Sequence, residues 1–124
     1  MTEEEFLKML EEISAELPMD FFQELNGGII MQPEAKYHPE SKESPLWILG
    51  EYAHGSAMGR YINIYYGSFI EVYGNLDRQA MKKKVRHTVL HEFRHHLESL
   101  AGEKDLEIED AVKLYRYKND KDFR

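Results

Sequence analysis

The sequence predicts an α+β fold in which a small, twisted and mainly antiparallel sheet packs against one long helix. Apolar residues recur at helical spacing over residues 77–100, whereas residues 46–52 and 60–66 are rich in β-forming residues. With 124 residues, 42% of them hydrophobic, the chain is long enough to bury a core. We therefore expect one domain over residues 1–124.

The N-terminal segment is predicted to form a helix that ends before Pro18. Thr2 is the expected N-cap, and the three glutamates after it favour the first turn because they face the positive end of the helix dipole. Apolar residues follow at helical spacing, at Phe6, Leu10, Ile13 and Leu17. A second, short helix is expected over residues 19–25, where an Asn-Gly-Gly sequence ends it.

Extended segments are predicted next. Residues 28–31 are expected to form a short strand, and the proline-containing stretch up to Pro45 is expected to form a loop. The pattern over residues 46–66 predicts a hairpin, because two runs of β-forming residues flank a glycine-rich connection. A further short extended piece is expected over residues 69–73.

The long helix is expected to begin after Gly74 and Asn75, with Asp77 in its early turns. Gly102 is the expected left-handed cap at its end. A last helix is predicted over residues 108–117, before a charged tail.

The long helix contains an H-E-x-x-H motif, from His91 to His95. Residues four apart lie on the same helix face, so the two imidazoles can bind one metal ion. Glu92 lies about 100° round the helix, where its carboxylate can reach a water bound to that metal. This arrangement is typical of zinc peptidases, in which the carboxylate acts as general base.

The surroundings of the motif favour a metal site. The residues that form an apolar arc on the other side of this helix are Val85, Val89, Leu90, Phe93, Leu97 and Leu100. A helix with one face in the core and the motif on the opposite face, beside Thr88, is suited to line a cleft. The alternative interpretation is an exposed polar face that carries solvated histidines.

Composition excludes several classes of protein and site. The chain has no cysteine, so a zinc ion must be held by nitrogen and oxygen ligands. Its net charge of −7 argues against nucleic acid as a partner. No apolar run approaches the roughly 18 residues that cross a membrane, and the acidic N-terminus is unlike a signal sequence. We expect a cytoplasmic protein that does not bind membranes.

The hairpin residues together with the sequence from Thr88 to His96 resemble the small bacterial zincin-like metallopeptidases, a family with a minimal zincin domain. The resemblance covers residues 46–110 and implies a Zn²⁺ site completed by a carboxylate after the helix. Members typically read H-E-x-x-H-H-x-G-x-x-D, whose last residue is the third ligand. This chain departs from that pattern, because Glu98 stands at the glycine and Ala101 at the third ligand.

If residues 100–107 are an insertion, Asp110 aligns with the third ligand of the family. The resemblance then implies metal binding by His91, His95 and Asp110. The nearby acids that compete for the role are Asp105, Glu107 and Glu109, and each could instead cap a helix.

The remaining histidines are not expected to bind the metal. His96 points about 100° away from His95 and is expected either to support the metal ligands without binding the metal or to pack at the edge of the helix. His87 lies one turn before His91, but three collinear histidines cannot all reach one ion. His38 and His54 are expected at the surface.

The leading functional hypothesis is a zinc-dependent peptidase that cuts an extended peptide or an unstructured protein segment. The hairpin over residues 46–66 is the expected place of binding, by addition of a strand. One alternative is a metal-binding or interaction module that keeps the fold without turnover, and another is an accidental motif. The sequence predicts no oligomeric state.

Overall fold

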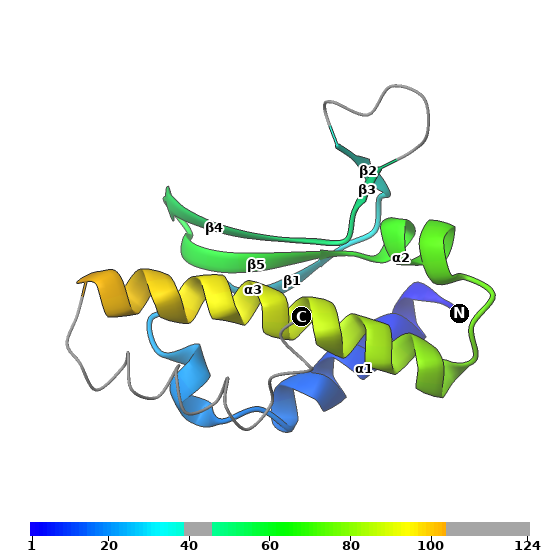
Figure 1. Cartoon of the computed structure of the whole chain (residues 1–124), viewed down its shortest axis with the longest axis horizontal. Helices are drawn as coiled ribbons and strands as arrows, with labels where there is room; N and C mark the ends of the chain where they lie inside the picture. Colours follow the sequence, from blue (N-terminus) through cyan, green and yellow to red (C-terminus); the bar gives the residue numbers. More distant parts are fainter. Residues whose placement is uncertain (39–45, 104–124) are drawn as a thin grey trace.

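The computed structural model describes residues 1–38 and 46–103, and confirms the α+β class. The elements are α1 (Glu3–Ala15), the 3-10 helix η1 (Met19–Phe22), β1 (Gly28–Gln32), β2 (Lys36–Tyr37), β3 (Trp47–Ile48), β4 (Gly50–Ser56), β5 (Gly59–Tyr65), α2 (Tyr66–Tyr73) and α3 (Arg78–Glu103). The sheet lies on one side of α3, and α1 lies on the same side of the sheet as α3 (Figure 1).

The predicted hairpin forms from β4 and β5, which pair antiparallel. β5 is the central strand of a three-stranded sheet in the order β1-β5-β4, and β1 pairs with it in parallel. β2 and β3 form a separate antiparallel pair that rises from one end of this sheet (Figure 1). The pairing is therefore mainly antiparallel, as predicted.

The N-terminal helix forms where its cap predicts. Thr2 and Glu5 make a capping box, in which the Glu5 N–H donates to Thr2 Oγ1 at 3.1 Å. The side chains that α1 buries are Phe6, Met9, Leu10 and Ile13. The second helix is shorter than predicted and is a 3-10 turn over Met19–Phe22.

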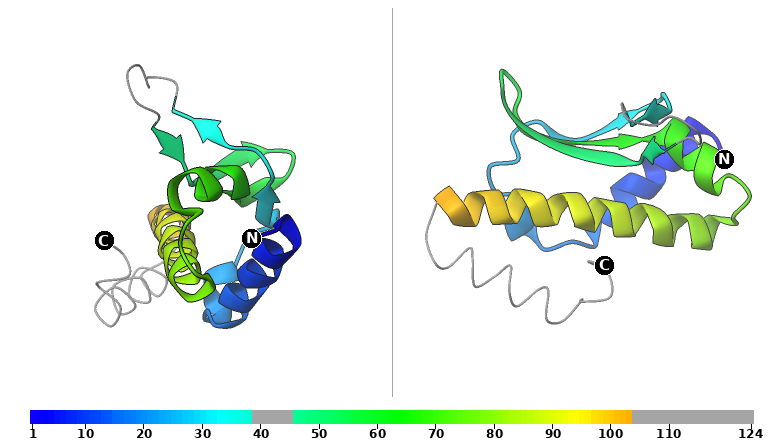
Figure 2. Two further views of the ribbon diagram at one scale, coloured as in Figure 1. Left: turned by 90° about the vertical axis from the view of Figure 1, so that its right-hand side faces the viewer. Right: turned by 45° about the horizontal axis from the view of Figure 1, so that its top comes forward.

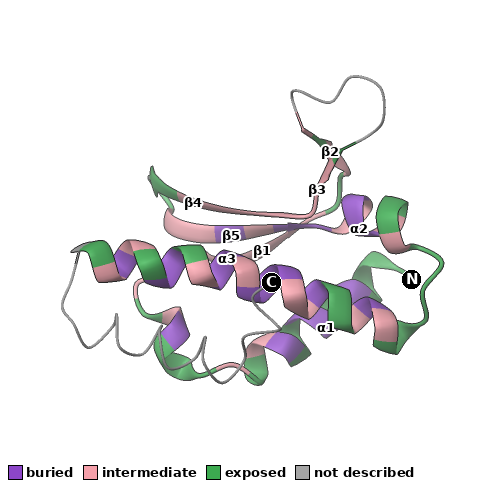
Figure 3. Ribbon diagram, in the orientation of Figure 1, coloured by how far each residue is buried: buried purple, intermediate pink, exposed green. Residues whose placement is uncertain are grey.

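The core lies between α1, α3 and the inner face of the sheet (Figure 2). The apolar arc of α3 is confirmed, and its buried side chains are Met81, Val85, Val89, Leu90, Phe93, Leu97 and Leu100. Ile62 and Ile64 of β5 pack in the same core as this arc and are fully buried. Figure 3 shows buried turns recurring along α3, as expected for a helix with one face in the core.

Two local predictions were wrong. Residues 69–73 lie in α2 rather than in a strand. Tyr66 and Phe69 recur at helical spacing, and their rings pack on Phe6 with centroids 5.3 and 5.5 Å apart from it. Their aromatic side chains suggested a strand, but burial on one helical face decides the structure. Lys36–Tyr37 forms β2 inside the predicted loop, and the Lys36 N–H donates to Ser68 Oγ at 2.9 Å.

The long helix begins as predicted but ends later. Asp77 caps it, because its Oδ1 accepts the Ala80 N–H at 2.8 Å. The helix then runs through Gly102 to Glu103, so the predicted left-handed cap at Gly102 was wrong. Leu100 is fully buried and holds the last turns on the core, which offsets the roughly 1 kcal/mol that a helical glycine costs. The predicted helix over residues 108–117 lies outside the described residues.

No helix in the described part of the chain is both long enough and apolar enough to cross a membrane.

Candidate active site

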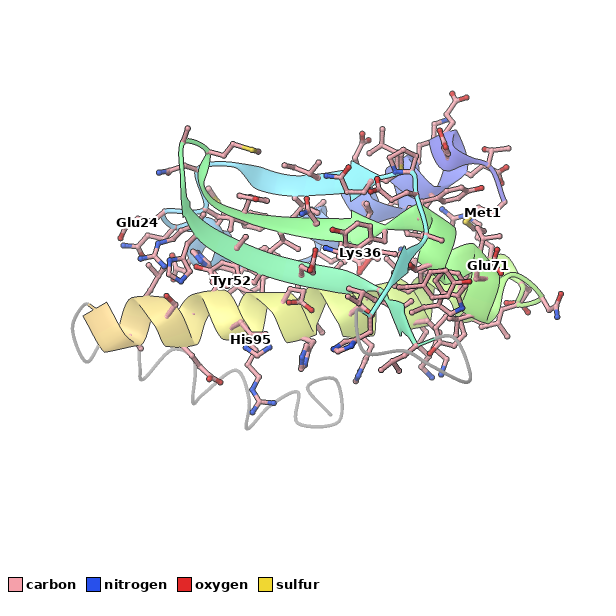
Figure 4. All side chains as sticks on the ribbon, turned by 90° about the horizontal axis from the view of Figure 1, so that it is seen from above. Met1, Glu24, Lys36, Tyr52, Glu71 and His95 are labelled. Carbon is pink, nitrogen blue, oxygen red and sulfur yellow. The ribbon has the colours of Figure 1, made fainter. Side chains whose placement is uncertain are left out.

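The two histidines of the motif have the geometry of a metal-binding pair. Their Nε2 atoms lie 3.2 Å apart, with the rings almost perpendicular at 88°. Two nitrogens bound to one tetrahedral zinc ion, each at about 2.0–2.1 Å, are about 3.3 Å apart. His95 is exposed on the side of α3 that lies beyond the edge strand β4 (Figure 4). The pair therefore fits a zinc ion without rearrangement of α3.

The surroundings of His91 favour the form that binds metal. Partial burial lowers the pKa of His91, and its electrostatic interactions with His95 and Arg94 lower it further. The imidazole is then neutral at neutral pH, and only the neutral ring can offer a lone pair to a metal ion.

Glu92 lies beneath β4 and is only 6% exposed. Burial raises its pKa to about 7, and the negative charge of Glu51 adds to the rise. A base works best when its pKa is close to the working pH, so this environment suits a carboxylate that takes up a proton.

A glycine makes this burial possible. A Cβ atom added at Gly50 of β4 would lie 2.8 Å from Thr88 Cγ2 and 3.2 Å from Glu92 Cγ. The strand can approach the helix this closely only because residue 50 has no side chain. Gly50 was not predicted as a contact from the sequence, although a glycine inside a strand pattern can indicate such an approach.

The third metal ligand is not located. Across residues 1–38 and 46–103 there is no group of three histidine, cysteine or acidic side chains that could hold a metal ion. The predicted ligand Asp110, and its competitors Asp105, Glu107 and Glu109, lie outside the described residues. The structure thus brings together His91 and His95, and the third ligand stays a prediction.

Among the described residues, no strand pairs with the outer edge of β4 next to the motif, and we call this edge the open edge. β4 is the outer strand of the sheet in the order β1-β5-β4, and α3 runs alongside it (Figure 4). The Tyr65 N–H donates to the Leu49 carbonyl at 2.9 Å, which makes these residues a hydrogen-bonded pair. Because such pairs alternate along an antiparallel ladder, the backbone groups of Gly50 and Tyr52 point away from β5, toward the open edge.

A buried network joins this edge to the helix. His96 is fully buried, with Nε2 at 2.8 Å from the Gln23 carbonyl and Nδ1 at 2.9 Å from Tyr52 Oη. Arg60 Nη1 donates to Tyr52 Oη at 3.0 Å and to Ser99 Oγ at 2.8 Å. The predicted packing of His96 against the helix edge is confirmed, but sequence alone did not reveal its partners.

A second polar cluster lies next to Gly50 on the strand. Lys36 Nζ donates to both oxygens of Glu51, at 2.9 and 3.0 Å, and the Tyr65 hydroxyl also donates to Glu51. Burial raises the pKa of Glu51, but these hydrogen bonds outweigh it and hold the pKa below its usual value. Glu51 is therefore ionised, which explains its effect on Glu92. The cluster also ties β2 to β4 and β5.

The other histidines lie apart from His91 and His95. His54 is exposed on β4, as expected, whereas His38 and His87 are partly exposed. Inside the motif, Arg94 Nε donates to Glu98 at 3.0 Å, four residues further on.

Comparison with known proteins agrees with this geometry. The zincin-like metallopeptidase family matches residues 33–114, which include the strands and the motif. Among solved structures, a conserved hypothetical protein from Thermo thermophilus is 42% identical to this chain, with a TM-score of 0.69. The match covers 83% of this chain and 100% of that one. No curated protein matches the chain.

Proposed function

Because the chain belongs to the zincin-like metallopeptidase family, we propose that it is a zinc-dependent peptidase in which His91 and His95 hold Zn²⁺ and Glu92 is the general base. The observation that carries the proposal is the 3.2 Å between the Nε2 atoms of the two histidines, which matches a tetrahedral zinc site. Asp110 is the proposed third ligand, with Asp105, Glu107 and Glu109 as alternatives.

The residues divide the chemistry between them. When bound, zinc acidifies a water molecule and polarises the carbonyl of the peptide bond to be cut. Glu92 accepts the proton of the attacking water on its carboxylate and later returns it to the departing amine. Its position under β4 keeps the carboxylate away from bulk water, which strengthens its interactions in the site.

The proposed substrate is an extended peptide or an unstructured protein segment. Gly50 and Tyr52 can offer backbone N–H and C=O groups to a strand added along the edge of β4. Folded proteins should resist, because most of their backbone groups are already paired within their own secondary structure. The net charge of −7 favours peptides with basic side chains, and this preference should weaken with salt because exposed charges are screened over about 8 Å at 0.15 M.

A second candidate is a zinc-binding or interaction module without turnover. It is favoured by one observation, that Ala101 stands at the position where the family pattern has its third ligand. A site held by two histidines alone would bind zinc weakly and would not hold it for catalysis.

A mixed peptide library distinguishes the two candidates. The library is incubated with zinc-loaded protein and with zinc-loaded Glu92→Gln, at two salt concentrations, and cleavage is read by mass spectrometry. We expect cleavage by the parent protein alone, with basic peptides favoured at low salt. If peptides bind both forms equally and none is cut, the binding module replaces the peptidase. If acidic peptides are cut preferentially, the electrostatic argument is wrong.

A further inference from the structure

His96, the residue directly after the motif, lies at the centre of a hydrogen-bond chain whose protons have one consistent arrangement when its imidazole is neutral. The Gln23 carbonyl can only accept, so His96 Nε2 carries the proton and donates to it at 2.8 Å. The other ring nitrogen, Nδ1, is then an acceptor, and the Tyr52 hydroxyl donates to it at 2.9 Å. Arg60, which can only donate, supplies the bond that Tyr52 Oη accepts.

These hydrogen bonds connect the two parts of the proposed site, which are the edge of β4 and the motif helix α3. Tyr52 is one of the two β4 residues whose backbone faces the open edge, and its side chain reaches across to α3. His96 follows His95 on the same turn of α3, so the helix that presents the metal-binding pair also holds the strand. The hydrogen bond between His96 and Tyr52 therefore fixes the distance of the Tyr52 backbone groups from His91 and His95.

We infer that His96 is a positioning residue, which through Tyr52 holds the edge of β4 at the place where an extended peptide pairs with it and reaches the metal. The inference rests on the proposed function, because it assumes that the edge binds a peptide. His96 does not touch the peptide or the metal. Its contribution is the acceptor at Nδ1, because that atom makes the hydrogen bond to the strand.

Two substitutions of His96 separate its two ring nitrogens. An asparagine amide reaches the position of Nδ1, so His96→Asn keeps an acceptor for Tyr52 but loses the bond to Gln23. A glutamine amide reaches the position of Nε2, so His96→Gln keeps the donor to Gln23 but loses the acceptor for Tyr52. Tyr52→Phe removes the same bond from the other side, together with the bond from Arg60, and keeps the ring in place, which guards against loss of folding.

The probes are two hydroxamates that bind zinc in the same way. Acetohydroxamate binds the metal alone, whereas acetyl-trialanine hydroxamate also carries a backbone that can pair with β4. For the zinc-loaded parent, the peptide hydroxamate should bind more tightly. His96→Gln and Tyr52→Phe should weaken it about tenfold, the effect of losing one or two backbone hydrogen bonds, and leave acetohydroxamate unchanged. His96→Asn should stay within about twofold of the parent.

The outcomes decide between positioning and a merely structural role. If the asparagine and glutamine variants lose peptide affinity equally, or if neither loses any, the inference is wrong. If both hydroxamates weaken together, His96 supports the metal site instead, which also overturns it. If the parent binds both hydroxamates equally, the edge holds no peptide and the inference fails, while zinc binding and cleavage of the library still test the proposed peptidase. Zinc content and the unfolding midpoint of each variant show that it is folded and loaded.

Discussion

Gly50 of β4 and Thr88 of α3 are in such close contact that a methyl group on Gly50 would lie 2.8 Å from Thr88 Cγ2. The contact brings the edge strand onto the motif helix directly above Glu92. Burial of that carboxylate, and with it the rise in its pKa, therefore depends on the missing side chain of Gly50.

Gly50→Ala should destabilise the protein by about 1–3 kcal/mol, because the added methyl forces β4 away from α3. Thr88→Ser removes Cγ2, so the double variant Gly50→Ala with Thr88→Ser should recover part of this loss. Chemical denaturation of the four proteins measures the coupling between the two sites. If Gly50→Ala costs the same free energy of unfolding with and without Thr88→Ser, this contact does not limit how closely β4 approaches α3.

The proposed zinc ligands His91 and His95 predict the metal content. His91→Ala and His95→Ala should each lose most of the bound zinc while staying folded, because one imidazole cannot hold the ion without its partner. Elemental analysis of protein purified without chelator measures zinc per chain. His54→Ala is the matched control, since His54 is exposed on β4. Full zinc in the double variant of His91 and His95 would exclude this site.

Glu92 predicts a pH dependence of the metal-free protein. Its pKa is 4.5 in the unfolded chain and about 7 in the folded protein, so the folded state binds the proton more tightly between these values. The free energy of unfolding should therefore fall as pH rises from about 4.5 to 7, by up to about 3 kcal/mol.

The comparison with Glu92→Gln isolates this effect, because glutamine does not titrate and all other groups are shared. With chelator present, the stability difference between variant and parent should shift in favour of the variant by about 3 kcal/mol between pH 4 and pH 8. Denaturation at each pH measures it. A difference that stays constant with pH would mean that Glu92 is not buried in this way.

The third ligand is tested in the same assay of zinc content. Asp110→Asn should weaken zinc binding more than Glu109→Gln or Asp105→Asn, because Asp110 takes the place of the family's carboxylate ligand if residues 100–107 are an insertion. Competition with a zinc chelator gives the relative affinities. If Asp105→Asn or Glu109→Gln has the larger effect, the insertion lies elsewhere in the sequence.

Sequence periodicity predicted the parts of the fold that one strong pattern controls. The buried arc of α3 from Val85 to Leu100 and the hairpin of β4 and β5 both follow from spacing alone. The spacing of His91 and His95 on α3 predicted their approach in the same way. These features are local, so nearby residues suffice to determine them.

The features that sequence missed depend on contacts between distant segments. Phe69 is helical because it packs on Phe6, and β2 forms because Lys36 meets Glu51 and Ser68. The role of Gly50 appears only when β4 lies against Thr88. Propensity predicts the secondary structure of such residues from their intrinsic preferences alone. Tertiary packing can override these preferences.

The short open edge of β4 also bears on how the protein behaves at high concentration. An unpaired strand edge can join the edge of another copy and start a growing sheet. Here the outward-facing backbone groups before the bulge belong to Gly50 and Tyr52, and the pairing becomes irregular between Ala53 and Ser56. A bulge interrupts the regular row of groups that a second copy would need. The edge is therefore long enough to bind a few residues of an extended peptide and too short to act as a template for aggregation.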